Sequence, residues 1–245
     1  MARRRWTREE LILAFDLYCR IPFGRIHIRN PDIIALAEII GRTPSAVSWK
    51  LANFARFDPA LQSRNVKGAV HGSAADEEIW NEFRQDGENL VLEAQQILAE
   101  KRGQPIPAGD EEPDDVADVR LGLDRDTTVK TRVGQSFFRA AVLASYNWTC
   151  CITGLREARL LNASHIAPWS TDVRNRVNPC NGLCLNALHD RAFDRGLMTI
   201  SADYCVMFAS EITAQEDEPM SALLLCYAGR EVKMPERFRP DPELL

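Results

Sequence analysis

The chain has 245 residues, a length that suits one large domain or two small ones, and its net charge is −5. Hydrophobic residues make up 45% and charged residues 27%, as in an ordinary globular protein. The charge argues against a generally basic nucleic-acid coat protein, and no apolar run approaches the roughly 20 residues that would span a bilayer.

The charge is unevenly distributed along the sequence. Residues 1–68 carry 12 Lys and Arg against 6 Asp and Glu, whereas residues 69–118 carry 3 against 14. Residues 119–245 carry 15 of each sign. A basic start, an acidic middle and a neutral remainder predict separate modules.

The cysteines and the first residues indicate the compartment. The chain begins MARRRW, but Asp16 interrupts the short apolar run that follows, so we expect no signal peptide. Seven cysteines are an odd number in a chain too large to need disulfides for its core. We therefore expect a protein of the reducing cytoplasm.

Three helices are predicted in the first 60 residues. Residues 6–20 carry a capping box, Thr7 with Glu10, before an apolar stripe at helical spacing. A second helix should run over residues 31–40, after Asn30 as its cap and before a terminating glycine. The third should begin at once, with Thr43 as its cap and a proline in its first turn.

The stretch LAEIIGRTPSAVSWKL, residues 36–51, resembles the second and third helices of helix-turn-helix DNA-binding domains. In such domains the later helix lies in the major groove, and its early residues meet base edges. The resemblance implies DNA contacts from Ser45, Ser48, Trp49 and Lys50, with Arg42 and Arg56 nearer the phosphates. The alternative is an ordinary three-helix bundle with a short loop.

The middle of the chain predicts helix and then linker. Residues 74–101 indicate one or two further helices that pack Trp80, Phe83, Leu90, Leu92 and Ile97, and no function is assigned to them. Residues 102–118 contain three prolines, two glycines and an acidic run, which is typical of a linker.

The pattern changes after the linker. Residues 128–146 predict a helix, and short apolar runs follow at 159–167, 183–185, 196–200 and 204–208. Between them ALHDRAFDRG, residues 187–196, reads as a helix that Gly196 closes. The expected order is strand, loop, strand, helix.

This region contains three spaced motifs. They are SHIAPW at 164–169, NGLCL at 181–185 and LHDRAFDRG at 188–196. Together they resemble the HNH endonuclease family, with its ββα-metal fold, and in particular the branch found in restriction endonucleases. The resemblance covers roughly residues 130–205.

The resemblance implies a role for each motif. Cutting a phosphodiester requires an activated water and stabilisation of the charge that develops on the phosphate and leaving oxygen. The resemblance assigns His165 as general base, Asn181 to holding the loop that positions this base, and His189 to the metal. A histidine alone on an apolar strand would more often be structural.

Two departures from the family pattern affect the metal. Many HNH enzymes place an acid or a histidine before the base, where this chain has Ser164, a poor ligand. The metal should then be held mainly from the helix, by His189 and Asp194, with Asp190 as the alternative to Asp194. One imidazole and one carboxylate, completed by water and phosphate oxygens, suit Mg²⁺ or Mn²⁺.

The second departure concerns structural zinc. Many HNH proteins carry two Cys-x-x-Cys pairs, and this chain has none. Cys151, Cys180 and Cys184 could supply a zinc site, but buried free thiols are the expected state, so we expect no structural zinc.

The sequence therefore predicts an α+β protein. An N-terminal all-α, helix-turn-helix-like module (1–101) precedes an acidic linker (102–118) and a C-terminal ββα-metal nuclease domain (119–245). The expected function is metal-dependent cleavage of double-stranded DNA in restriction or defence, with no membrane partner and with a homodimer as the favoured state for cutting both strands. The alternatives are a DNA-binding regulator with an inactive HNH fold, and a modification-dependent nuclease whose N-terminal module is the reader.

Overall fold

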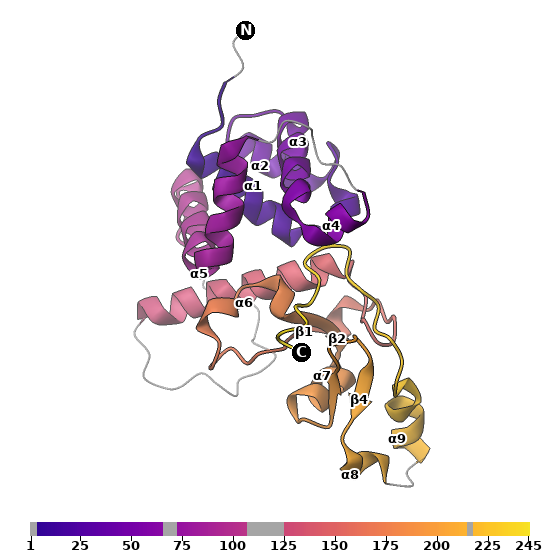
Figure 1. The fold of residues 1–245 in the computed structure, drawn as a ribbon. Helices are drawn as coiled ribbons and strands as arrows, with labels where there is room; N and C mark the ends of the chain where they lie inside the picture. The colour runs from indigo at the N-terminus through magenta and orange to yellow at the C-terminus, as the bar shows by residue number, and fades with distance from the viewer. Residues whose placement is uncertain (1–3, 66–72, 107–124, 215–217) are drawn as a thin grey trace.

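The computed structural model describes residues 4–65, 73–106, 125–214 and 218–245, with the side chains of 125–127 left aside. Figure 1 shows the N-terminal helices as one group and the strands with their short helices as another. Helix α6 lies across the boundary between the two groups (Figure 1). None of the helices within the described residues is long and apolar enough to cross a membrane.

The N-terminal helices begin where their capping residues predict. Helix α1 (Arg8–Arg20) has the complete Thr7–Glu10 capping box. Asn30 caps α2 (Pro31–Ile39), Thr43 caps α3 (Pro44–Phe54) and Asp58 caps α4 (Pro59–Ser63). Gly41 adopts φ of 63° between α2 and α3, a conformation that costs glycine little. The three predicted helices are thus confirmed, although the third, expected to reach Phe57, ends as an α-helix at Phe54 and continues as a 3-10 turn (Ala55–Phe57).

The segment labelled α5 (Ala74–Arg102) consists of two helices joined at a sharp kink (Figure 1). Asp86 departs from helical geometry, with φ of −146° and ψ of 64°. The segment buries Trp80, Phe83, Leu90 and Ile97, as predicted, whereas Val91 rather than Leu92 is the fully buried residue of its middle turn. The expected linker begins inside the last turn of α5, and its residues 107–118 lie outside the described part of the chain.

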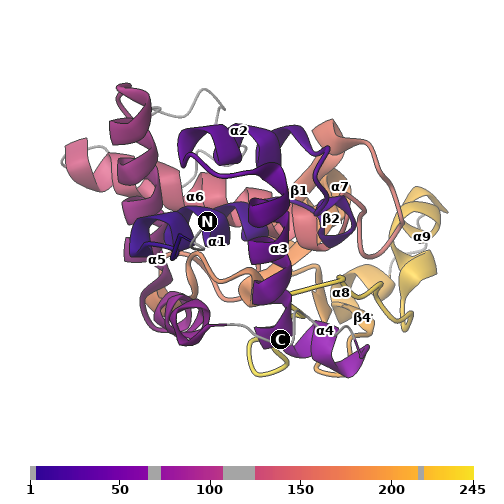
Figure 2. The same cartoon turned by 90° about the horizontal axis from the view of Figure 1, so that it is seen from above.

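Helix α6 (Arg125–Ser145) packs on both groups of elements. Val133, Phe137 and Ala141 are buried in the apolar cluster of the N-terminal helices. Phe138 and Val142 are buried in the second cluster, with the strands. Figure 2 shows α6 running beneath α1 and α3 when the molecule is seen from above.

The C-terminal part contains two small antiparallel sheets. Strand β1 (Leu161–His165) pairs with β2 (Gly182–Asn186), and α7 (Ala187–Asp194) follows directly. Strands β3 (Met198–Ile200) and β4 (Val206–Phe208) form the second sheet, before the short helices α8 (Ser210–Thr213) and α9 (Glu218–Leu223). The predicted order of strand, loop, strand and helix is confirmed, and so is the α+β class.

The C-terminal tail returns to the N-terminal helices. Arg237 is fully buried and donates hydrogen bonds to the carbonyls of Tyr18 (2.5 Å) and Ile21 (2.6 Å). Phe238 stacks on Trp80, with ring centroids 5.9 Å apart. The division into modules at the linker stays a prediction, but the described residues on either side of it share one apolar cluster.

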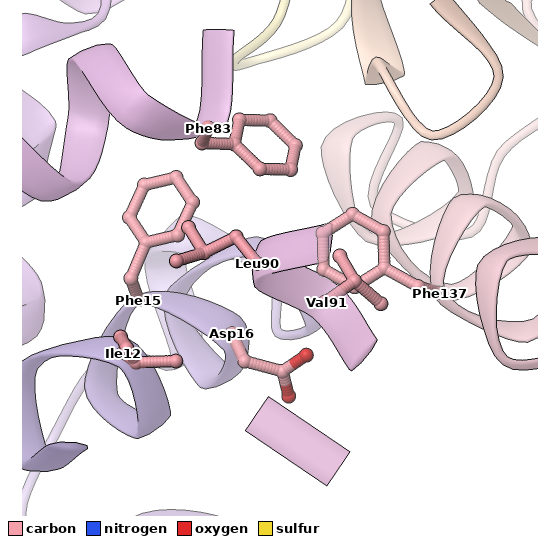
Figure 3. A pocket seen from close by; sticks show the side chains of 7 residues that line it. All are labelled: Ile12, Phe15, Asp16, Phe83, Leu90, Val91 and Phe137. Carbon is pink, nitrogen blue, oxygen red and sulfur yellow. The ribbon is translucent and has the colours of Figure 1, made fainter. Parts of the chain in front are cut away.

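A cavity of about 10 Å³ lies where α1, α5 and α6 meet, room for at most a single water. Figure 3 shows its lining, which is apolar except for the Asp16 carboxylate. Asp16 pairs with Arg20 at 2.9 Å, and its Oδ1 has no hydrogen-bond partner among the described residues. Burial raises the pKa of Asp16. The three helices otherwise pack closely.

Candidate active site

His165 ends β1, directly opposite Gly182 at the start of β2. A Cβ atom at Gly182 would lie 2.3 Å from Cγ2 of Val142 and 2.9 Å from Cζ of Phe138. Only glycine therefore lets α6 approach the β1–β2 hairpin this closely. The same approach places the Phe138 ring against the imidazole, with centroids 3.6 Å apart and planes within 12°.

The contacts of His165 define its protonation. Its Nε2 lies 2.9 Å from the carbonyl oxygen of Arg176, and a carbonyl can only accept, so Nε2 carries the proton. The lone pair is then on Nδ1. Burial lowers the pKa of His165 to about 4, so the ring is neutral at neutral pH. A neutral imidazole with one lone pair can take up a proton.

Asn181 is fully buried and closes the long loop between β1 and β2. Its side-chain Oδ1 accepts from the Ala167 amide at 2.7 Å, and its Nδ2 donates to the carbonyls of Ala167 (3.0 Å) and Asn175 (3.2 Å). Its own carbonyl accepts from the Ile166 amide at 2.9 Å. These bonds fix the chain that immediately follows His165.

His189 lies in the first turn of α7, whose cap is Asn186. The Asn186 Oδ1 accepts from the His189 amide and from His189 Nδ1, each at 3.0 Å, so the lone pair of the neutral ring is on Nε2. This Nε2 is buried and has no hydrogen-bond partner among the described residues. The Tyr227 ring packs edge-on against the imidazole at 5.3 Å, and burial lowers the pKa of His189.

The carboxylate that α7 turns toward β1 is that of Asp190. Ser164 Oγ donates to Asp190 Oδ1, and Asn162 Nδ2 donates to Asp190 Oδ2 at 2.6 Å. Asp190 and Ser164 are both buried, whereas Asp194 is exposed on the last turn of α7. Of the two carboxylates that the sequence left open, the structure brings Asp190 to the sheet.

These residues fit a divalent cation only in part. His189 offers one buried nitrogen whose lone pair is unused, and Asp190 offers a carboxylate. The described residues contain no group of three or more His, Cys, Asp or Glu that could hold a metal ion. Water and phosphate oxygens would therefore have to supply most of the ligands.

The cysteines considered for zinc are buried or half-buried thiols. Cys151 and Cys184 lie side by side, since the Cys151 amide donates to the Cys184 carbonyl at 2.8 Å. Burial raises the pKa of Cys180 and of Cys184 to about 12 and also raises that of Cys151. Burial therefore favours the neutral thiol over the thiolate in the metal-free protein.

Two of the predicted DNA contacts, Lys50 and Arg42, have internal ion-pair partners, which disfavours a role in binding DNA. Lys50 is buried, and its Nζ lies 2.7 Å from Oδ1 of the fully buried Asp76. The Arg42 side chain is 9% exposed, pairs with Glu10 at 2.7 Å and stacks over Trp6 at 4.1 Å. Both cations therefore join helices together instead of facing a ligand.

The other predicted contacts remain on the surface. Ser45 is exposed, Ser48 and Arg56 are half-buried, and Trp49 is 64% exposed. The guanidinium of Arg56 lies 5.1 Å from the Phe57 ring centroid. These four residues could still contact DNA.

Sequence reasoning missed Phe138, Asn186 and Arg176 as parts of the site. The sequence signalled only Asn186, since an Asn three residues before a histidine at a helix start is a capping pattern. The stacking of Phe138 and the carbonyl contact of Arg176 depend on packing across the fold, which no local motif encodes.

Comparison with known families agrees with the site. Residues 150–201 match the profile of an HNH endonuclease family. This segment contains His165, Asn181 and His189, so the resemblance read from the motifs is confirmed, and the chain carries a nuclease segment of the HNH type. The match does not extend to the N-terminal helices. No curated protein matches the chain.

Proposed function

We propose that the protein is a metal-dependent DNA endonuclease and that His165 is its general base. The observation that carries the proposal is the state of His165 within the HNH segment. Its Nε2 is bound to a backbone carbonyl at 2.9 Å, and the pKa of about 4 leaves Nδ1 unprotonated. An anionic phosphate beside the ring favours the imidazolium and raises this pKa, so the base strengthens when substrate binds.

The neighbouring residues have supporting roles. Asn181 holds the loop after His165 through its bonds to Ala167 and so positions the base. His189 and Asp190 are the residues that would hold Mg²⁺ or Mn²⁺, which replaces the sequence-based pairing of His189 with Asp194. A bound divalent cation supplies electrostatic stabilisation of the leaving oxygen.

The N-terminal helices supply affinity for double-stranded DNA in this proposal. Ser45, Ser48, Trp49 and Arg56 are the candidate contacts, because Lys50 and Arg42 are engaged inside the fold. A restriction or defence role in the cytoplasm, with a homodimer on DNA, extends the same proposal. It is motivated by the family branch that the motifs resemble.

The test is plasmid cleavage by the purified full chain in Mg²⁺, Mn²⁺ or EDTA, on unmodified and modified plasmid. We expect metal-dependent cutting that His165→Ala reduces by at least roughly 100-fold, as loss of a general base should. His27→Ala is the matched control, because His27 is exposed in a loop far from the motifs. Cutting by His165→Ala at the wild-type rate would refute the assignment of the base.

A specific observation supports one alternative, a DNA-binding regulator with an inactive HNH fold. Ser164 stands where many relatives have a ligand, and it donates its hydrogen bond to Asp190. If the wild type binds DNA and cuts none of these plasmids, whereas Ser164→Asp cuts in Mg²⁺, the regulator is the correct reading. Cutting by the wild type excludes it.

A further inference from the structure

We propose that Arg176 is a further DNA-contacting residue, whose guanidinium binds the backbone phosphate next to His165. The inference rests on the proposed nuclease function and deepens it. The motifs read from the sequence assign no role to this arginine.

Arg176 is held beside the imidazole by contacts at both ends. Its backbone carbonyl lies 2.9 Å from His165 Nε2. Its side chain turns back to Trp169, where Nε donates to the Trp169 carbonyl at 2.8 Å and the guanidinium carbon lies 5.4 Å from the ring centroid. The Trp169 ring in turn meets the imidazole edge-on at 5.5 Å. The three residues are thus linked in a closed set of contacts, in which Arg176 meets His165 through its backbone carbonyl and Trp169 through its side chain, so the guanidinium is held through Trp169 near the base.

Helix α6 packs against Trp169 at Gly134. A Cβ atom at Gly134 would lie 3.0 Å from Cη2 of Trp169 and 3.2 Å from Cγ1 of Val177. The indole is therefore packed tightly against α6. Because Trp169 cannot move freely, the guanidinium that lies over it is preorganised, which lowers the entropic cost of binding a ligand.

The terminal nitrogens of Arg176 are unused. Only its Nε donates within the described residues, and no carboxylate there forms an ion pair with its guanidinium. By contrast, the half-buried Arg20 and Arg42 are both paired with acids. A stacked guanidinium with two free terminal amino groups matches the geometry of phosphate oxygens. Arg176 thus offers the positive charge that a scissile phosphate beside Nδ1 of His165 would need.

The first arm of the test is DNA binding by the full chain in EDTA, where cleavage does not interfere. We compare wild type, Arg176→Met and Arg174→Met as salt is raised. Arg174 is exposed two residues away and makes none of these contacts, so it matches the charge change. We expect Arg176→Met to lower the slope of log affinity against log salt by about 0.9, the value for one phosphate contact, and Arg174→Met to leave it unchanged.

The second arm is the cleavage rate, with Arg176→Lys added. Substituting the side chain keeps the carbonyl that binds His165, so the change reports the guanidinium alone. We expect Arg176→Met to cut roughly 10- to 100-fold more slowly. Arg176→Lys should restore the salt slope but not the rate, because an ammonium lacks the anchored fork.

Each outcome decides the proposal. An unchanged salt slope for Arg176→Met, or equal losses for both methionine variants, overturns it, as does full recovery of the rate in Arg176→Lys. If the wild type cuts no DNA, the nuclease function fails, but the binding arm still tests the phosphate contact independently. Thermal melting of each variant confirms that the loop has remained folded.

Discussion

The buried ion pair of Lys50 and Asp76 allows a test of whether Lys50 has a structural role or contacts DNA. The Asp76 carboxylate is fully buried and also accepts from the Ser73 amide at 3.2 Å, where it completes the capping box of α5. Lys50→Met removes the only cation bonded to this carboxylate among the described residues. An uncompensated buried charge costs about 3–5 kcal/mol, which for a chain of this size lowers the melting temperature by roughly 10 °C.

The assay is urea and thermal denaturation, followed by DNA binding below the melting transition. Lys101→Met is the matched control, because Lys101 forms an exposed pair with Glu9 and its loss should cost under about 1 kcal/mol. Adding Asp76→Asn to Lys50→Met should recover part of the loss, since the neutral amide needs no cation. A Lys50→Met protein of normal stability that has lost DNA affinity would refute the structural reading and restore the lysine to the DNA contacts.

Three further predictions concern the packing at Gly182, the protonation of His165 and the anchoring of the C-terminal tail. Gly182→Ala should lower the free energy of unfolding by about 1–3 kcal/mol through overpacking, because its Cβ would meet Val142 at 2.3 Å. Gly24→Ala is the control in urea titrations, because a Cβ there has nothing within 4 Å. Equal effects of the two substitutions would contradict the close approach of α6 to Gly182. The free energy of unfolding should fall by about 3 kcal/mol between pH 6.5 and pH 4, because His165 binds a proton at the ordinary pKa of 6.5 in the unfolded state but only near 4 in the folded state. Urea titrations across this pH range measure the fall, and the part due to His165 should be absent from His165→Gln. Arg237→Met should cost about 3 kcal/mol in the same titrations, because it leaves buried carbonyls of the N-terminal helices unpaired, and a near-neutral effect would show that the tail is not anchored there.

The N-terminal helices were predictable from sequence because their signals are local. Thr7, Asn30 and Thr43 each bond an amide within the next three residues, so the cap and its helix are encoded together. The fate of Lys50 was not predictable in this way. Its partner Asp76 is 26 residues away on another helix, and a charged residue on a predicted recognition helix reads as exposed until that helix packs.

The candidate site likewise contains residues that local motifs indicate and others that only the packing of the fold identifies. His165, Asn181 and His189 could be proposed from the sequence because the motif spacing is local to one hairpin and its helix. The choice of Asp190 over Asp194 required knowing which turn of α7 lies against β1, which the sequence of the helix does not fix. Residues at i and i+4 lie on one helical face, so both carboxylates fit the spacing and only the bonds to Ser164 distinguish them.

The uneven charge predicted separate modules, yet adjacent residues of α6 connect them. Phe137 packs on Phe83 of α5, with ring centroids 5.7 Å apart, and the next residue, Phe138, stacks on His165. A chain cut at the predicted linker would expose Val133, Phe137 and Ala141 to water and remove the helices that hold α6 in place. The N-terminal helices thus hold α6, and with it the Phe138 ring that stacks on His165, in place. Residues 119–245 therefore share their packing with the N-terminal helices and do not form a separately packed unit.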